Sequence, residues 1–228
     1  MKERIPELFK PILKHLKMPE NRRKIIEFQM HQAAQTLEPC KEKDLKYALY
    51  CLGNLIEALP YLDLADQWAS IYGYLKKYSA HGDCRVRNAA IWAYGICTTK
   101  SPKHLLSMEF VKEVLSTAEA AYKLPQLGQD LEDFEHCRDN CVAVVGLVLR
   151  EFIGIYEVDY LIQGWLQCLP LRHDQVEGRG QMQILMGLVA GGRVTKNKQA
   201  ICQVLRVYAE FIELSTKARL KENTKTLG

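Results

Sequence analysis

Apolar residues recur at the helical spacing of i, i+3, i+4 and i+7 along nearly the whole 228-residue chain. Alternation of apolar and polar residues never lasts long enough to predict a β-strand. Proline and glycine interrupt the helical pattern at regular intervals. The pattern predicts helices over residues 5–17, 21–36, 43–58, 63–78, 84–98, 105–122, 135–151, 157–168, 174–190 and 197–215. We therefore expect an all-α protein.

Residues at the predicted helix starts support these boundaries. Asp63, Asp83 and Ser101 are of the types whose side chains accept a hydrogen bond from the first turn of a helix, so we expect them to be N-caps. Many helices of this moderate length, joined by short turns, fit stacked helix pairs better than a single bundle.

The 8 cysteines are scattered among apolar residues, and no two have the C-x-x-C spacing of a metal or redox site. Cys137 and Cys141 are four residues apart, which places both thiols on one core-facing side of the helix predicted over 135–151. We expect reduced thiols that pack as small apolar groups, rather than disulfides or a metal site. Such thiols indicate a reducing compartment, the cytosol or the nucleus.

The net charge is only +4, less basic than is usual for a dedicated nucleic-acid-binding domain, so we expect no nucleic-acid partner. The charge is uneven along the chain: the first third is basic, an acidic inter-helix loop is expected at about 123–135, and a basic tail covers about 217–228. No apolar run approaches the ~20 residues of a membrane span, so we expect no membrane association.

Four segments share a repeated pattern of a polar turn, a helix with an apolar stripe, and a glycine. The glycines are Gly53, Gly95, Gly146 and Gly187, which are 42, 51 and 41 residues apart. Periods near 40 residues are typical of HEAT repeats, and the extra residues in the middle interval fall in the acidic stretch.

The second segment carries the most diagnostic pattern, D-x-x-V-R-x-x-A-x-x-x-x-G over 83–95. Asp83 caps the helix, Val86 enters the core, and Ala90 allows close packing of the partner helix. The pattern resembles the second helix of a HEAT repeat. The resemblance implies a right-handed α-solenoid of about five antiparallel HEAT-type helix pairs, an armadillo-type fold that forms a single domain over 1–228.

Three blocks narrow the resemblance: V-R-N-A-A-I-W-A-Y-G over 86–95, N-C-V-A-V-V-G over 140–146, and W-L-Q-C-L-P-L over 165–171 followed by Asp174. In this order and spacing they resemble blocks in the C-terminal repeats of the importin-beta (karyopherin-beta) superfamily, in the importin-five-like branch. The resemblance implies a nuclear import receptor for protein transport, found in cytoplasm, nucleus and nuclear pore.

The same resemblance implies the partners. These are protein cargo with a nuclear localisation signal, along the concave face, and Phe-Gly nucleoporins, between first helices on the convex face. In the superfamily the Ran GTPase binds N-terminal repeats, which have no counterpart here. We therefore expect the chain to be the C-terminal part of a longer receptor, with Ran binding supplied by the missing part.

A stripe of candidate partner-binding residues follows from the repeat register. In the helix over 84–98, Val86, Ala90, Ala93 and Cys97 form the expected core stripe, and Arg85, Asn88 and Trp92 lie opposite. Aligning the glycines extends this opposite stripe along neighbouring second helices. The full set is Lys43, Lys46, Tyr50, Arg85, Asn88, Trp92, His136 and Asp139.

Exposed aromatic rings next to cations would give a partner contact area and attract its acidic groups. The alternative for Tyr50 and Trp92 is packing between adjacent repeats as ordinary core. Trp68 and Trp165 lie on first helices, where we expect them in the core.

The sequence contains no Walker motif, no G-x-S-x-G and no H-E-x-x-H, so we predict a non-catalytic scaffold without cofactor or metal. Two alternatives stay open. One is a generic HEAT-repeat scaffold subunit. The other is a HEAT-like DNA alkylpurine glycosylase, in which Trp92, Arg85, Arg87 and Asp139 would engage a damaged nucleotide.

Overall fold

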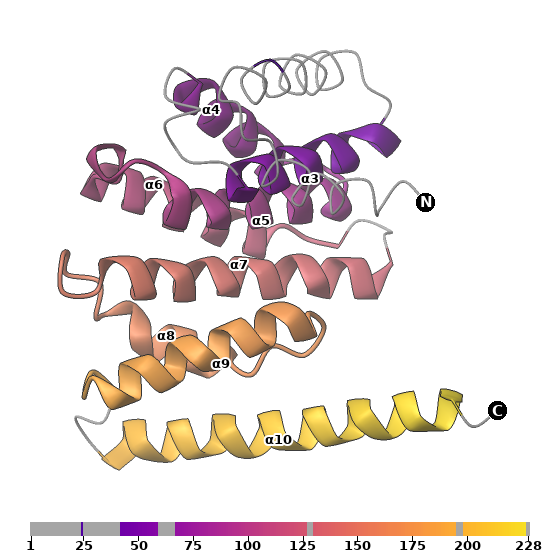
Figure 1. The fold of residues 1–228 in the computed structure, drawn as a ribbon, viewed down its shortest axis with the longest axis vertical. Helices are drawn as coiled ribbons and strands as arrows, with labels where there is room; N and C mark the ends of the chain where they lie inside the picture. Colours follow the sequence, from indigo (N-terminus) through magenta and orange to yellow (C-terminus); the bar gives the residue numbers. More distant parts are fainter. Residues whose placement is uncertain (1–23, 25–41, 59–66, 127–129, 195–197, 227–228) are drawn as a thin grey trace. The chain divides into compact units, whose positions relative to one another are not determined.

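The computed structural model describes Lys24 and residues 42–58, 67–126, 130–194 and 198–226, so the predicted helices over 5–17 and 21–36 and the predicted cap Asp63 lie outside the described residues. Within the described part the regular elements are all helices, which confirms the all-α prediction (Figure 1). They are α3 (Glu42–Ala58), α4 (Trp68–Ser79), α5 (Cys84–Lys100), η3 (Lys103–Leu105), α6 (Met108–Lys123), α7 (Leu131–Phe152), α8 (Leu161–Cys168), α9 (Gln175–Ala190) and α10 (Lys198–Thr226).

The chain divides into two compact units, Met1–Val144 and Val145–Gly228, and the boundary falls inside α7. We refer to them as unit 1 and unit 2 and describe each separately.

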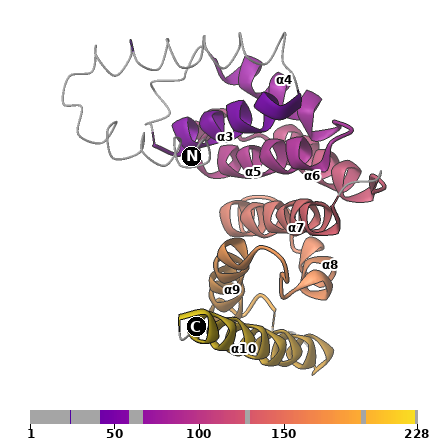
Figure 2. The same cartoon turned by 90° about the vertical axis from the view of Figure 1, so that its right-hand side faces the viewer.

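Helix α5 is the centre of unit 1. Helices α3, α4 and α6 all pack against it (Figures 1 and 2). The predicted core stripe of Val86, Ala90, Ala93 and Cys97 is fully buried, as expected. Burial of Ile91 and Tyr94 extends the buried surface around most of the helix. Each fully buried large apolar side chain contributes about 1.5–3 kcal/mol, so this helix is a main source of the stability of unit 1.

The ends of α5 test two predicted caps. Asp83 is the N-cap, and its carboxylate accepts a hydrogen bond from the backbone N–H of Arg85 at 2.8 Å. The prediction for Ser101 is wrong, because this residue ends α5: its N–H donates to the carbonyl of Cys97 at 3.0 Å. The short 3-10 turn after Pro102 delays the next helix, and Ser107 caps α6 instead.

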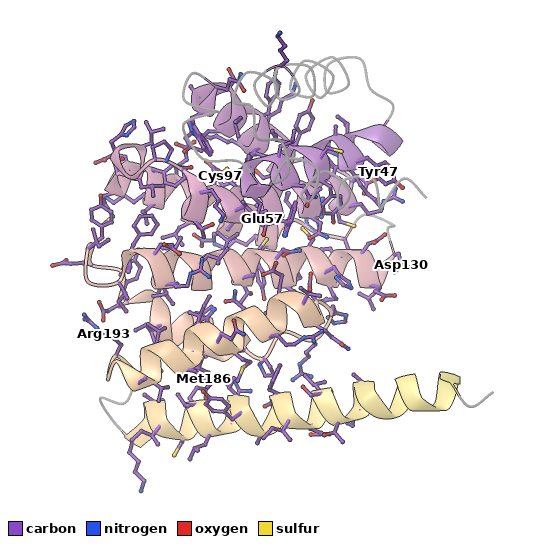
Figure 3. All side chains as sticks on the ribbon, in the orientation of Figure 1. Tyr47, Glu57, Cys97, Asp130, Met186 and Arg193 are labelled. Carbon is purple, nitrogen blue, oxygen red and sulfur yellow. The ribbon has the colours of Figure 1, made fainter. Side chains whose placement is uncertain are left out.

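The acidic segment before the third repeat is more helical than expected. Helix α7 begins at Leu131, four residues before the predicted start at 135, so Glu132 and Asp133 lie in its first turn. Asp130, labelled in Figure 3, accepts a hydrogen bond from the N–H of Glu132 at 2.7 Å. Negative charge at a helix N-terminus is stabilising, which explains why the acidic residues extend the helix instead of forming a loop.

Unit 2 contains α8, α9 and α10 (Figure 1). Helix α10 packs against α8. Trp165 of α8 is 2% exposed, and Trp68 of unit 1 is equally buried, so the prediction that both belong to the core is confirmed. Helix α10 continues to Thr226, beyond the predicted end at 215. Good helix formers and the Glu213–Lys217 ion pair, one turn apart, support this extension.

The described cysteines are free thiols, and Cys84, Cys97, Cys137 and Cys141 are buried. Cys137 and Cys141 occupy the core-facing side of α7, as their spacing predicts. In the described parts of the chain, no group of three potential metal-ligating side chains comes together. Nor does any helix there have the length and apolar character needed to cross a membrane.

Candidate partner-binding surface

Tyr50 of α3 and Trp92 of α5 form an aromatic pair at the surface of unit 1. Their ring centroids are 5.4 Å apart and the rings are tilted by 55°. Both side chains are partly exposed, in contrast to the fully buried Trp68. The two rings therefore pack against each other, and each side chain keeps part of its surface in solvent. This arrangement lies between the exposed anchors and the ordinary core residues considered from the sequence.

A glycine of α3 makes room for the indole. A Cβ atom at Gly53 would lie 2.4 Å from Cζ3 of Trp92, which is too close for real atoms, and 3.1 Å from Cβ of Ala93, which is a tight contact. The missing side chain of Gly53 thus lets the Trp92 ring rest directly on the backbone of α3. The backbone of α3 therefore limits how far the indole can move toward that helix.

Asn88 connects the aromatic pair to a buried amide. Its Nδ2 donates to the Tyr50 hydroxyl at 3.4 Å, and its Oδ1 accepts from Nδ2 of Asn140 at 2.7 Å. Asn140 is 4% exposed, so its hydrogen bond connects a buried side chain of α7 to the partly exposed Asn88. The chain Asn140–Asn88–Tyr50 holds the polar tip of the tyrosine on the same side as the indole. We name Tyr50, Asn88 and Trp92 the aromatic patch.

The cation expected beside the patch is already paired. Arg85 donates to the carboxylate of Asp83 through Nε at 3.1 Å and Nη2 at 2.7 Å, and Asp133 lies 4.0 Å from its Nε. The hydrogen bond from the Arg85 side chain is the main cause that lowers the pKa of Asp83. Arg85 is therefore less available to acidic partner groups than an isolated arginine would be.

The other predicted residues are not gathered into the patch. Lys46 places its ammonium 5.4 Å from the ring centroid of Tyr47, and His136 lies 4.0 Å from Glu132 on its own helix. Asp139 is partly buried on α7, and Lys43 belongs to α3, where only its backbone is described. Of the eight predicted residues, the structure joins Tyr50, Asn88 and Trp92 by direct contacts.

Sequence reasoning missed two contributors, Gly53 and Asn140. Gly53 was taken only as a repeat marker, although a glycine beside a bulky ring is a signal of close approach. Asn140 lies on the same buried side of α7 as Cys137 and Cys141, so its polar side chain on an apolar stripe was the available signal. Arg87 is 1% exposed, so it is not available to the DNA contact that the glycosylase alternative assigns to it.

The patch presents two aromatic rings, an amide and a hydroxyl group. Partly exposed aromatic rings offer contact area at a low conformational-entropy cost, and the amide and hydroxyl groups offer hydrogen bonds to a partner backbone. The fold shows an all-helical protein and no narrower class. Neither the protein-family models nor the curated proteins compared with this chain give a match.

Proposed function

We propose that the chain is a non-catalytic protein-interaction scaffold, the cargo- and nucleoporin-binding part of a nuclear import receptor. In this proposal its helices form HEAT-type pairs of a right-handed solenoid that acts in the cytoplasm, the nucleus and the nuclear pore. The Ran GTPase would act on it only through N-terminal repeats of a longer receptor.

The observation that carries the proposal is the aromatic patch. A tilted Tyr50–Trp92 pair, seated on Gly53 and oriented by Asn88, has the features of an anchor for a partner segment: rigid, amphipathic and partly exposed. The sequence blocks over 86–95 and 165–171 that resemble import receptors give the partner class. The cation on α5, Arg85, is paired with Asp83, which fits a mixed-charge surface better than a strongly acidic or basic pocket.

Three probes test the proposal on the whole chain. The immobilised protein is titrated with a nuclear-localisation-signal peptide, with a Phe-Gly nucleoporin fragment, and with alkylated duplex DNA. We expect saturable binding of the peptide and of the Phe-Gly fragment, and no release of damaged bases from the DNA. Base release would sink the scaffold proposal and support the glycosylase alternative.

A generic scaffold subunit is distinguished by the same panel. Such a protein would bind neither the signal peptide nor the Phe-Gly fragment above the level of a scrambled peptide of equal charge. That result would be consistent with a protein-interaction scaffold but would contradict the proposal of an import receptor.

A further inference from the structure

Helix α10 is held in unit 2 by one of its faces. Val204 and Val207 of that face are 6% and 0% exposed, and α10 packs against α8. Nη2 of Arg206 donates to the carbonyls of Leu166 and Leu169, at 3.3 and 3.1 Å. These carbonyls lie at the C-terminal end of α8, where a helix leaves its last carbonyls without partners of its own. The contacts therefore determine which side of α10 is turned away from α8.

Another side of α10 carries a row of exposed apolar side chains. Ile201 is 42% exposed, and Leu205 and Ile212 are each 63% exposed. Tyr208, which is partly exposed, lies between them. The intervals of four, three and four residues place all four side chains on one side of the helix, as in a coiled-coil seam, and we name them the α10 stripe. An apolar row of this kind, in contrast to scattered apolar residues, is typical of a protein–protein contact.

The α10 stripe is complementary to itself. In an antiparallel pair of α10 helices, a two-fold axis at the middle of the stripe sets Ile201 of one copy against Ile212 of the other. The same axis sets Leu205 of each copy against Tyr208 of the other. Every member of the stripe then meets another apolar side chain. A contact of this kind uses the same surface on both copies, so it closes as a dimer.

The charges at the two ends of the stripe favour the antiparallel direction. Lys198 lies one turn before the stripe and Glu213 directly follows it, and both are exposed. An antiparallel pair brings Lys198 of each copy near Glu213 of the other, whereas a parallel pair would bring like charges together. Oε1 of Glu213 accepts a hydrogen bond from Lys217 of its own helix, and a carboxylate has capacity for a second cation. Charge complementarity thus points to a second copy of this chain as the occupant of the stripe.

We propose that the α10 stripe is a homodimer interface, in which the α10 helices of two copies pair antiparallel. The two helices face each other over residues 198–215, a length of about 27 Å at 1.5 Å per residue. So short a contact belongs to the weak, reversible interfaces, and monomer and dimer therefore exchange with concentration. This inference does not depend on the proposed function, because the aromatic patch lies in unit 1 and the α10 stripe in unit 2.

The first test measures the dimer itself, by analytical ultracentrifugation of the whole chain over a wide concentration series. We expect a monomer–dimer equilibrium in the wild type. Leu205→Glu places a charge at the centre of the contact and should weaken dimerisation at least tenfold. Met186→Glu is the matched control, since Met186 is 58% exposed in unit 2 but lies on α9, and this variant should dimerise like the wild type. A wild type that stays monomeric throughout, or equal dimerisation of the two variants, would overturn the proposal.

The second test uses charge reversal to determine the direction of the helices. Lys198→Glu and Glu213→Lys should each weaken the dimer, because each places like charges at both ends of the antiparallel contact. The double variant restores opposite charges between copies and should regain affinity, with circular dichroism as the check that every variant stays helical. In a parallel dimer the double variant would still hold like charges together. Absence of recovery would therefore overturn the antiparallel arrangement.

The third test determines the register by disulfide formation. Ile201→Cys and Ile212→Cys are made in a Cys202→Ser background, because Cys202 is exposed and close to the stripe. An equal mixture of the two variants should form a disulfide-linked dimer on mild oxidation, and the Cys202→Ser protein alone should not. Each variant by itself should crosslink poorly, since the two copies of its new thiol would lie about 16 Å apart along the helix, too far for a disulfide. Faster crosslinking of the separate variants than of the mixture would contradict this register.

Discussion

Gly53 in unit 1 and Gly146 in unit 2 occupy the same place in the repeated sequence pattern, but different side chains fill the space that each leaves open. Trp92 rests on Gly53. A Cβ atom at Gly146 would lie 1.8 Å from Oε1 of Gln181 and 2.9 Å from Nε1 of Trp165. The spacing of small residues therefore predicts close approach of neighbours, but it does not predict which chemical group arrives.

The side chains that pack against the two glycines also differ in their exposure to solvent. Gln181 and Trp165 are 1% and 2% exposed, and the indole N–H donates to the amide oxygen at 3.0 Å. Both side chains of this pair are buried inside unit 2. The Tyr50–Trp92 pair keeps part of its surface in solvent. A buried amide–indole pair contributes to stability alone, whereas a partly exposed aromatic pair can also meet a partner.

The largest effect on stability should come from removing the buried indole of Trp165, which packs against Gly146. We expect Trp165→Ala to reduce the free energy of unfolding by about 3–5 kcal/mol, since it leaves a cavity and removes the partner of Gln181. Trp92→Ala should cost only about 1–2 kcal/mol, because its ring is already partly solvated. Chemical denaturation followed by circular dichroism measures both. Equal losses would show that Trp92 is ordinary core.

Adding a methyl group at each glycine tests how tightly its neighbouring side chains are held. Gly146→Ala should destabilise by about 2–3 kcal/mol, because the buried Gln181 has no room to move and loses its bond to Trp165. Gly53→Ala should cost about 1 kcal/mol, because Trp92 can swing outward and alanine favours the helix. Tyr50–Trp92 contact, followed by indole fluorescence, should change only in Gly53→Ala. The reverse order of costs would mean that the Trp92 seat is the more rigid.

Truncating the amides compares the two hydrogen-bond systems. Gln181→Ala leaves a buried indole N–H unpaired and should cost about 2 kcal/mol. Asn140→Ala should cost about 1 kcal/mol, since the partly exposed Asn88 can recover a hydrogen bond from water. Thermal unfolding of both variants checks the order. A cost for Asn140→Ala above that of Gln181→Ala would show that the Asn140–Asn88 bond is the more isolated from solvent.

The smallest effect concerns the ion pair beside the aromatic patch. Asp83→Asn keeps an N-cap but loses the charge bound to Arg85. We expect the free energy of unfolding to fall by about 0.5 kcal/mol at neutral pH. The pKa of Asp83 is lowered in the folded protein, so its contribution is present above the unfolded pKa of about 4 and is lost as pH falls through the folded value. Wild type and variant should converge in stability below about pH 3. A constant difference across this range would exclude the ion pair as its cause.

Local signals in the sequence predicted the all-helical class and most helix boundaries. The start of α5 follows from Asp83, and most helix ends lie within a few residues of a proline or glycine, because such residues act on the backbone nearby. Ser101 misled because the same residue type occurs at both ends of helices, and the 3-10 turn after it leaves no sequence periodicity.

The candidate site was harder to predict for physical reasons. Asn140 and Asn88 are 52 positions apart, and periodicity within one helix carries no information about such a pair. Burial of Arg87 runs against the usual exposure of arginine, and only its tertiary contacts reveal it. In contrast, pairing of Arg85 with Asp83, two positions away, could have been read from the sequence.

The central claim is that the partly exposed aromatic pair binds a partner segment. Isothermal titration of a nuclear-localisation-signal peptide into wild type, Trp92→Ala and Tyr160→Ala tests it most directly. Tyr160 is the matched control, since it is 70% exposed and lies outside the aromatic patch. We predict that Trp92→Ala weakens binding at least tenfold, about 1.4 kcal/mol, while Tyr160→Ala leaves it unchanged. Equal affinities for all three proteins, with Trp92→Ala folded, would contradict the account.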